Sequence, residues 1–297
     1  MTYEQFKEEV LKLLKEEYAG QDVTVELRQV LKTNGVKLDG LFVWEKNEDG
    51  GDMISPTIYL ERYYTKYNYL GMSVEEILQE IVEIMKTRNR DDFMPHNIFG
   101  TWEERKKDIR LQLINFKNNS EILNTCLYER FLDLAVVPRL VVAQTEDGVT
   151  SMRVDDSCLN IWNVTKQDVF NAAYHNLRQE HFKCISLSEM LGMEMDEGMY
   201  DFHVFTNKET LNGSVAMLRN DLLKEFSDKN GGVDVFIAPS SLHEVLLLCD
   251  YGTDETDVEG LKSVIRTANR EVVSIEDKLS DNLYKYEADK GEVVIAE

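Results

Sequence analysis

The stretch Val233–Gly252, VDVFIAPSSLHEVLLLCDYG, decides the fold of the last third of this chain. It holds two apolar runs, Val233–Ala238 and Val245–Cys249, separated by a few polar residues. Both runs are short, and Val245–Cys249 is continuous and apolar, which is typical of a buried strand. Pro239 has no backbone N–H and cannot continue a central strand. The stretch therefore predicts two buried strands joined by a single turn.

The polar residues between the runs, Ser240, Ser241, His243 and Glu244, allow two interpretations. In the first, a serine is a nucleophile, His243 is its base and an acid such as Glu244 orients the histidine, which requires all three groups within hydrogen-bond reach. In the second, Ser241 to Glu244 form a capping box of the S-x-x-E type. No G-x-S-x-G elbow surrounds either serine, which favours the structural interpretation.

Helices and strands interleave outward from this stretch. A helix is predicted near residues 1–20, and an Asn-Gly turn at 34–35 joins strands at 23–27 and 38–44. Serine and threonine caps predict helices from Ser73, from Thr101 to about Phe116 and from Thr165 to about Glu180. Further strands or helices are expected at 57–60, 134–143, 149–154, 202–205, 213–226, 258–273 and in a terminal hairpin around 289–291. Because proline has no backbone N–H, Pro138 predicts that part of the 134–143 strand lies at a sheet edge or in a bulge.

This order of elements predicts an α+β fold with mixed or antiparallel sheets and interleaved helices. A length of 297 residues suggests two domains. The asparagine-rich segment Lys117–Ser120 is the predicted boundary. We therefore expect an N-terminal α+β domain over 1–118 and a C-terminal α+β domain over 119–297.

The net charge of −22 is concentrated after about residue 186, where the sequence has 10 Lys and Arg residues and 24 Asp and Glu residues. Such a surface repels phosphate groups, so neither direct nucleic-acid binding nor an anionic membrane partner is expected. The start of the chain lacks the pattern of a signal peptide, and no run of eighteen apolar residues occurs, which predicts a cytoplasmic protein. The four cysteines are widely spaced and predict buried free thiols.

Motifs for metals and cofactors are missing from the sequence. There is no CxxC pair, no H-E-x-x-H and no glycine-rich phosphate loop. His175 and His181 lie six residues apart, which is too far for one helical metal site. We expect no metal and no cofactor.

Five tyrosines cluster in a short segment: Tyr59, Tyr63, Tyr64, Tyr67 and Tyr69. Aromatic series of this kind usually belong to a core or to a hairpin face, but amphipathic tyrosines are also enriched at protein interfaces. The sequence leaves both interpretations open.

Four short sequences resemble one bacterial family of unknown function, found mainly in anaerobic Firmicutes. They are Ser55–Glu61, Tyr64–Tyr67 with Gly71, Phe205–Asn207 with Gly213, and Ala238–Val245. The resemblance runs nearly end to end, with Ala238 in place of a larger aliphatic residue and Ser214 in place of alanine. It implies a bacterial, cytoplasmic protein and no particular chemistry.

The sequence thus favours a non-catalytic cytoplasmic protein that acts through a protein partner, with the tyrosine series as its candidate binding residues. The first alternative is a hydrolase that uses Ser240 or Ser241 with His243. A further alternative is an acidic mimic of nucleic acid, which requires carboxylates spaced along one face of the molecule.

Overall fold

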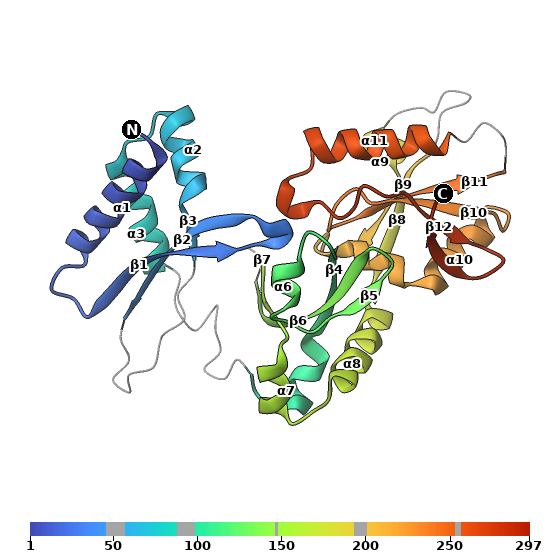
Figure 1. The fold of residues 1–297 in the computed structure, drawn as a ribbon, viewed down its shortest axis with the longest axis horizontal. Coiled ribbons are helices and arrows are strands. Elements are labelled where there is room, and N and C mark those ends of the chain that lie inside the picture. The colour runs from blue at the N-terminus through green and yellow to red at the C-terminus, as the bar shows by residue number, and fades with distance from the viewer. Residues whose placement is uncertain (46–56, 88–98, 146–147, 193–200, 253–256) are drawn as a thin grey trace. The chain divides into compact units, whose positions relative to one another are not determined.

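The computed structural model describes residues 1–45, 57–87, 99–145, 148–192, 201–252 and 257–297 (Figure 1). Helices interleave with antiparallel sheets, so the predicted α+β class is confirmed. The chain divides into two compact units, and neither is continuous in sequence. Unit 1 comprises residues 1–32, 36–98 and 142–150, and unit 2 comprises 33–35, 99–141 and 151–297. None of the described helices is long and apolar enough to cross a membrane.

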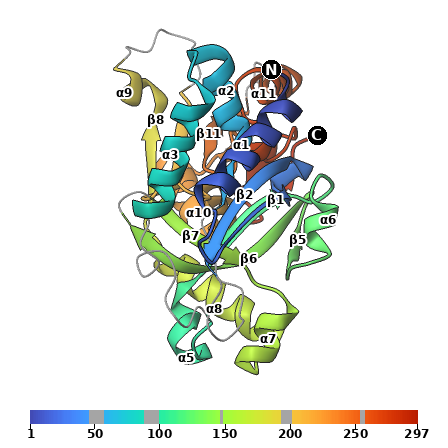
Figure 2. The ribbon, with the colours of Figure 1, turned by 90° about the vertical axis from the view of Figure 1, so that its left-hand side faces the viewer.

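Unit 1 packs helices against one face of a three-stranded sheet (Figures 1 and 2). The predicted Asn-Gly hairpin forms, with residues 34 and 35 in the left-handed region at φ 59° and 73°. The core of the unit joins the apolar stripe of the first helix to Leu41 on the sheet and to Ile77 and Ile81 on the helix that Ser73 caps. The elements are α1 (Tyr3–Glu17), β1 (Val23–Leu31), β2 (Lys37–Glu45), β3 (Ile58–Tyr59), α2 (Leu60–Leu70) and α3 (Val74–Thr87).

The tyrosine-rich segment differs from its prediction. A strand was expected over residues 57–60, but only Ile58 and Tyr59 pair with β2, and the chain then turns into α2. Tyrosine is a weak helix former, so local propensity gives little sign of this helix. Burial of Leu60 and Tyr63 against α1 and α3 stabilises it instead.

Unit 2 contains a six-stranded antiparallel sheet in the order β13-β12-β10-β11-β9-β8. The two strands predicted from the opening stretch, β10 and β11, are neighbours at its centre, with Asp234 opposite Asp250 and Ala238 opposite Leu246. Helix α11 covers one face and α10 the other (Figure 1). The elements are β8 (Phe182–Ser186), α9 (Leu187–Leu191), β9 (His203–Asn207), η3 (Gly213–Leu218), α10 (Asn220–Lys229), β10 (Asp234–Ala238), β11 (Val245–Asp250), α11 (Val258–Glu271), η4 (Ile275–Asp277), β12 (Tyr284–Glu287) and β13 (Glu292–Ile295).

A second sheet, most of which belongs to unit 2, has the order β4-β6-β5, with β7 also paired to β6. Residues 142–145 of β6 and 148–150 of β7 are counted in unit 1. Helix α8 packs on β4, and the capping box predicted at Thr165 begins it. The predicted boundary segment, residues 117–120, lies inside this unit, and Asn119 is buried there. The elements are η1 (Thr33–Gly35), α5 (Trp102–Arg105), η2 (Lys106–Asp108), β4 (Ile109–Asn115), α6 (Ser120–Leu123), β5 (Glu129–Phe131), β6 (Leu134–Thr145), β7 (Gly148–Arg153), α7 (Asp156–Trp162) and α8 (Lys166–Gln179).

Two predictions for this sheet were wrong. The capping box at Thr101 forms, but its helix ends at Arg105, and Ile109–Asn115 is a strand whose residues pair with β6. Pro138 lies in the interior of β6 and not at an edge. The Pro138 carbonyl accepts a hydrogen bond from the Val154 N–H on the side of β6 away from β4. In an antiparallel strand the N–H and the C=O of one residue point to the same side, so the N–H that proline lacks would also point there, just beyond the end of β7.

The carboxylate of Asp133 links the two sheets of unit 2. Asp133 lies in the turn between β5 and β6, and its oxygens accept hydrogen bonds from the Tyr284 hydroxyl at 2.7 Å, the Ser280 hydroxyl at 2.8 Å and the Asn282 side chain at 3.0 Å. Tyr284 is fully buried at the start of β12. One carboxylate therefore satisfies three donors, one from β12 and two from the segment that precedes it.

Replacing Asp133 with alanine should lower the free energy of unfolding by about 3 kcal/mol, because it leaves the buried Tyr284 hydroxyl without an acceptor. Tyr284→Phe should cost only about 1 kcal/mol, since the other two bonds to Asp133 persist. Urea unfolding of the full chain measures both, and Asp22→Ala, at an exposed site, is the control. Equal losses for Asp133→Ala and Asp22→Ala would contradict this role.

Candidate functional site

The loop between β10 and β11, Pro239–Glu244, carries the predicted serine and histidine residues. The Ser241 hydroxyl accepts from the His243 N–H at 3.0 Å, and the Ser240 hydroxyl donates to the Glu244 carboxylate at 3.2 Å. The Ser241 N–H donates to the Glu244 carbonyl. The predicted capping box does not form, because a strand follows the loop and offers no helical N–H groups to cap. The loop is a hairpin turn closed by its own polar groups.

Both ring nitrogens of His243 have partners in the fold. Nδ1 accepts from the backbone N–H of Asn212 at 3.2 Å, and Nε2 lies 3.2 Å from a carboxylate oxygen of Asp277 in η4. A backbone N–H can only donate, so Nδ1 is unprotonated and the neutral ring carries its proton on Nε2, which donates to Asp277. The ring is 33% exposed. In this arrangement His243 joins three segments and has no ring bond to either serine hydroxyl.

The His243 bonds continue into the second sheet of unit 2. The Asn212 side chain accepts from Gln112 at 2.8 Å, and Gln112 in turn accepts from Arg139 at 3.2 Å. Arg139 also donates to the hydroxyl and carbonyl of Ser151. Burial, together with the nearby charge of Arg153, lowers the pKa of Arg139 to about 10. A chain of polar contacts thus runs from Arg139 to Asp277.

The sequence did not predict Asn212, Gln112 or Asp277. Asn212 and Asp277 lie 31 and 34 residues from His243, and Gln112 lies a further 100 residues from Asn212. Local spacing therefore cannot reveal them. The sequence offered one signal, Gln112, because a glutamine between Leu111 and Leu113 needs a hydrogen-bond partner where the strand is buried.

Two of the family-like sequences meet at this loop. The Thr206 hydroxyl on β9 donates to the His243 carbonyl at 2.6 Å. Gly213 passes so close that an added Cβ would lie 2.1 Å from the Thr206 hydroxyl oxygen and 2.4 Å from the His243 carbonyl oxygen. Gly213 has no positive φ, so lack of space alone requires glycine here. The hairpin loop therefore packs closely against Gly213 and the segment Phe205–Asn207.

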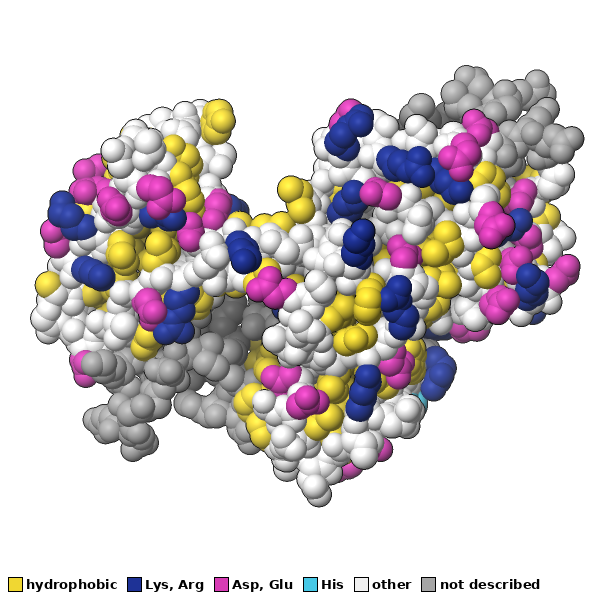
Figure 3. Space-filling view, in the orientation of Figure 1, with side chains coloured by type: hydrophobic (Ala, Val, Ile, Leu, Met, Phe, Trp, Pro, Cys, Tyr) yellow, Lys and Arg dark blue, Asp and Glu magenta, His cyan; other side chains and the backbone are white. Residues whose placement is uncertain are grey.

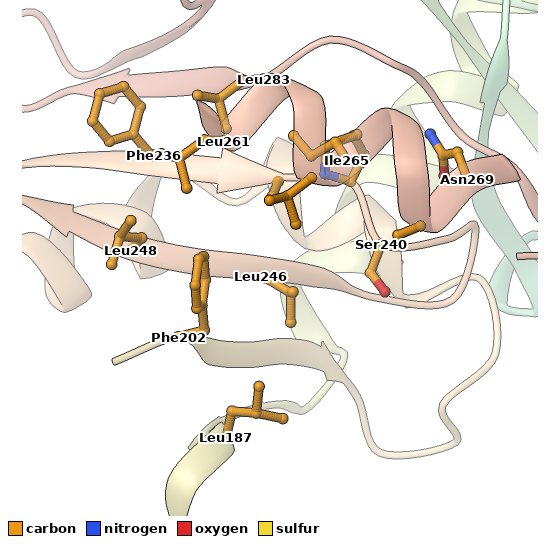
Figure 4. Close-up of a pocket in the computed structure, with 14 residues that line it drawn as sticks. Leu187, Phe202, Phe236, Ser240, Leu246, Leu248, Leu261, Ile265, Asn269 and Leu283 are labelled. Atoms are coloured by element: carbon orange, nitrogen blue, oxygen red, sulfur yellow. The ribbon is translucent and has the colours of Figure 1, made fainter. Parts of the chain in front are cut away.

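An apolar cavity of about 260 Å³ adjoins the loop between α11 and the sheet (Figure 4). Ala238, one of the two departures from the family pattern, lines it beside Ser240. Among the described residues that line the cavity, the polar side chains are those of Ser240 and Asn269, and Figure 4 shows both at the same end of the cavity. The apolar lining comes from Leu187, Phe202, Phe236, Ala238, Pro239, Leu246, Leu248, Leu261, Val264, Ile265, Ala268 and Leu283.

The tyrosine series divides into packed and exposed members. Tyr63 is buried, and the rings of Tyr64 and Tyr67 stack at 6.2 Å while packing on Phe6. Tyr59 accepts a hydrogen bond from Lys32 at 3.3 Å. Tyr69 is 82% exposed, and its neighbour Leu70 is 73% exposed. Within the series, Tyr69 therefore offers most of its surface to a partner.

The four cysteines of the chain differ in burial. All four cysteines are free, but only Cys158 is buried, and Cys184 is exposed because β8 is an edge strand. Burial raises the pKa of Cys158 to about 11. In the part of the chain that the structure describes, no three His, Cys, Asp or Glu side chains gather as a metal site would need.

Comparison with known proteins identifies the family. The model described as "Family of unknown function (DUF5688)" matches residues 3–288, and the chain belongs to this family. No curated protein and no solved structure matches it. The resemblance predicted from the short sequences is thereby confirmed at the level of the family.

The tautomer of His243 is open to direct measurement. ¹⁵N NMR of the neutral ring should show an unprotonated Nδ1 and a protonated Nε2, because Nδ1 accepts from Asn212. The spectrum of His243→Gln assigns the signals. A proton on Nδ1 would contradict the bonding described for the loop.

Alanine substitutions at the neighbouring residues 213 and 214 should differ in their effect on stability. Gly213→Ala should lower the free energy of unfolding by about 1–3 kcal/mol, because backbone atoms block the new Cβ. The buried Ser214 hydroxyl has no partner among the described residues, so Ser214→Ala should be neutral or stabilising. Thermal unfolding of the two variants tests the pair, and a harmless Gly213→Ala would show that the close approach is not rigid.

Proposed function

We propose that this family member is a non-catalytic cytoplasmic protein that binds a protein partner through the end of α2. One observation carries the proposal: Tyr69 and Leu70 are adjacent, large and mostly exposed, whereas Tyr63, Tyr64 and Tyr67 on the same helix pack against the core of unit 1. Exposed tyrosines are enriched at protein interfaces and among the residues that contribute most of the binding energy. Leu70 adds apolar area beside the Tyr69 ring.

The charges near these two residues favour a basic partner. Helix α3 begins four residues after Leu70, and Glu75 and Glu76 in its first turn are exposed. Glu76 forms the capping box with Ser73, whose hydrogen bonds lower the pKa of the Glu76 carboxyl, so it is ionised at neutral pH. Apolar anchors beside fixed carboxylates match a partner surface that combines an apolar hollow with Lys or Arg.

The hydrolase alternative has weaker support from the geometry. A serine nucleophile needs a base that can take its proton, but Nδ1 of His243 accepts from Asn212, and Nε2–H donates to Asp277. The hydroxyls of Ser240 and Ser241 bond to Glu244 and to the His243 N–H. The two serine hydroxyls are thus bonded to other groups of the same loop and not to the imidazole ring.

The nucleic-acid mimic also has little support. Such a mimic needs a row of carboxylates that repeats the spacing of phosphates. On the face that Figure 3 displays, the Asp and Glu side chains of the described residues are interspersed with Lys and Arg. The mixed charge of this face supports neither a nucleic-acid mimic nor a nucleic-acid binder there.

A photo-crosslinking residue placed at position 69 tests the proposal against one at position 272. Tyr69 and Val272 are 82% and 83% exposed, so the two sites are matched in accessibility. In extracts of the source cells, position 69 should capture one basic protein and position 272 none. Leu70→Ser in the same chain should reduce capture about tenfold or more, and high salt should weaken it because surface charges contribute.

Two results would count against this proposal. Equal capture from positions 69 and 272 would mean non-specific contact, and capture that survives Leu70→Ser would remove the anchor. Circular dichroism of the Leu70→Ser chain serves as the folding control.

A further inference from the structure

We propose that the cavity between α11 and the six-stranded sheet binds a small, neutral, mainly apolar molecule that carries one hydrogen-bond donor. The described residues on its wall all belong to unit 2. The site is therefore separate from the proposed docking residues on α2, and the two proposals can fail independently.

The size and lining of the cavity set the body of the ligand. Its walls come from strands β10 and β11, from Phe202 before β9, and from the inward face of α11 (Figure 4). Val264 lines the cavity and is nevertheless 64% exposed, so it marks an opening on the α11 side. An apolar cavity of about 150 Å³ holds benzene, so about 260 Å³ suits a ligand of about ten heavy atoms.

The two polar side chains on the wall define the head group of the ligand. Both N–H bonds of the Asn269 amide are used, one by the Ser280 carbonyl at 2.7 Å and the other by Asp281 at 2.9 Å. Its oxygen has no donor among the described residues. The Ser240 hydroxyl gives its proton to Glu244 and keeps its lone pairs. Both groups can therefore only accept, and the ligand has to donate.

The local charge excludes an anionic head group. Among the described residues, no Lys or Arg lines the cavity, and its two polar side chains are bonded to the carboxylates of Glu244 and Asp281. A carboxylate or phosphate brought there would have no counter-charge and no donor, and it would lose its hydration. A hydroxyl or an amide N–H meets both requirements.

Three probes of similar length separate these requirements in calorimetric titrations of the full chain. 1-Octanol has the donor, its isomer 1-methoxyheptane has the same size but no donor, and octanoate is the anionic counterpart. We expect 1-octanol to bind at least about tenfold more tightly than either of the others, which is the effect of one satisfied hydrogen bond. Equal binding of the two isomers, tighter binding of octanoate, or no binding of any probe would overturn the assignment.

Two substitutions locate the site. Ala238→Leu fills the cavity from β10 and should weaken 1-octanol binding at least about tenfold without lowering the melting temperature, because it occupies empty space. Val264→Trp blocks the opening from an exposed position and should have the same effect on binding even if Ala238→Leu fails to fold. Val272→Leu, exposed beyond the end of α11, is the control and should bind normally. Unchanged binding in Val264→Trp would place the ligand elsewhere and overturn the proposal.

Discussion

The close approach of Gly213 to the β10–β11 loop is the constraint on which the candidate site depends. Only a residue without a side chain can pass between the Thr206 hydroxyl and the His243 carbonyl. That passage places the Asn212 N–H, one residue earlier, against Nδ1 of His243. The ring is then fixed, and its other nitrogen reaches Asp277. The loop, β9 and η4 are held together by backbone geometry as much as by any side chain.

This constraint explains how the polar residues of the β10–β11 loop bond within the fold. The stretch Val233–Gly252 correctly predicted two buried strands joined by a turn, because the length of an apolar run and the missing N–H of Pro239 act locally, and because the two strands pair with each other. The role of His243 could not be predicted, since Asn212 and Asp277 come from distant segments. The predicted helix from Thr101 failed for a related reason: its capping box is local, but the pairing of Ile109–Asn115 with β6 is not.

The tyrosine series shows the same division between local and non-local information. Its density was visible in the sequence, and the choice between core and surface was not. The packing of Tyr64 and Tyr67 on Phe6 and the burial of Tyr63 depend on α1, which lies far earlier in the chain. Tyr69 is exposed because α2 ends at Leu70, where Gly71 adopts a left-handed conformation and turns the chain towards α3. The helix end, more than the residue type, separates the exposed tyrosine from the packed ones.

Asn269 connects the stability of unit 2 with the properties of its cavity. Its amide fixes the last turns of α11 to the Ser280 carbonyl and to Asp281, and Ser280 in turn donates to Asp133 between the two sheets. These bonds tie the end of α11 to the segment before β12, which is in turn bonded to the turn between β5 and β6. The same bonds use both amide protons and leave the oxygen as an acceptor. The anchoring of the helix and the preference for a donor ligand therefore have one cause.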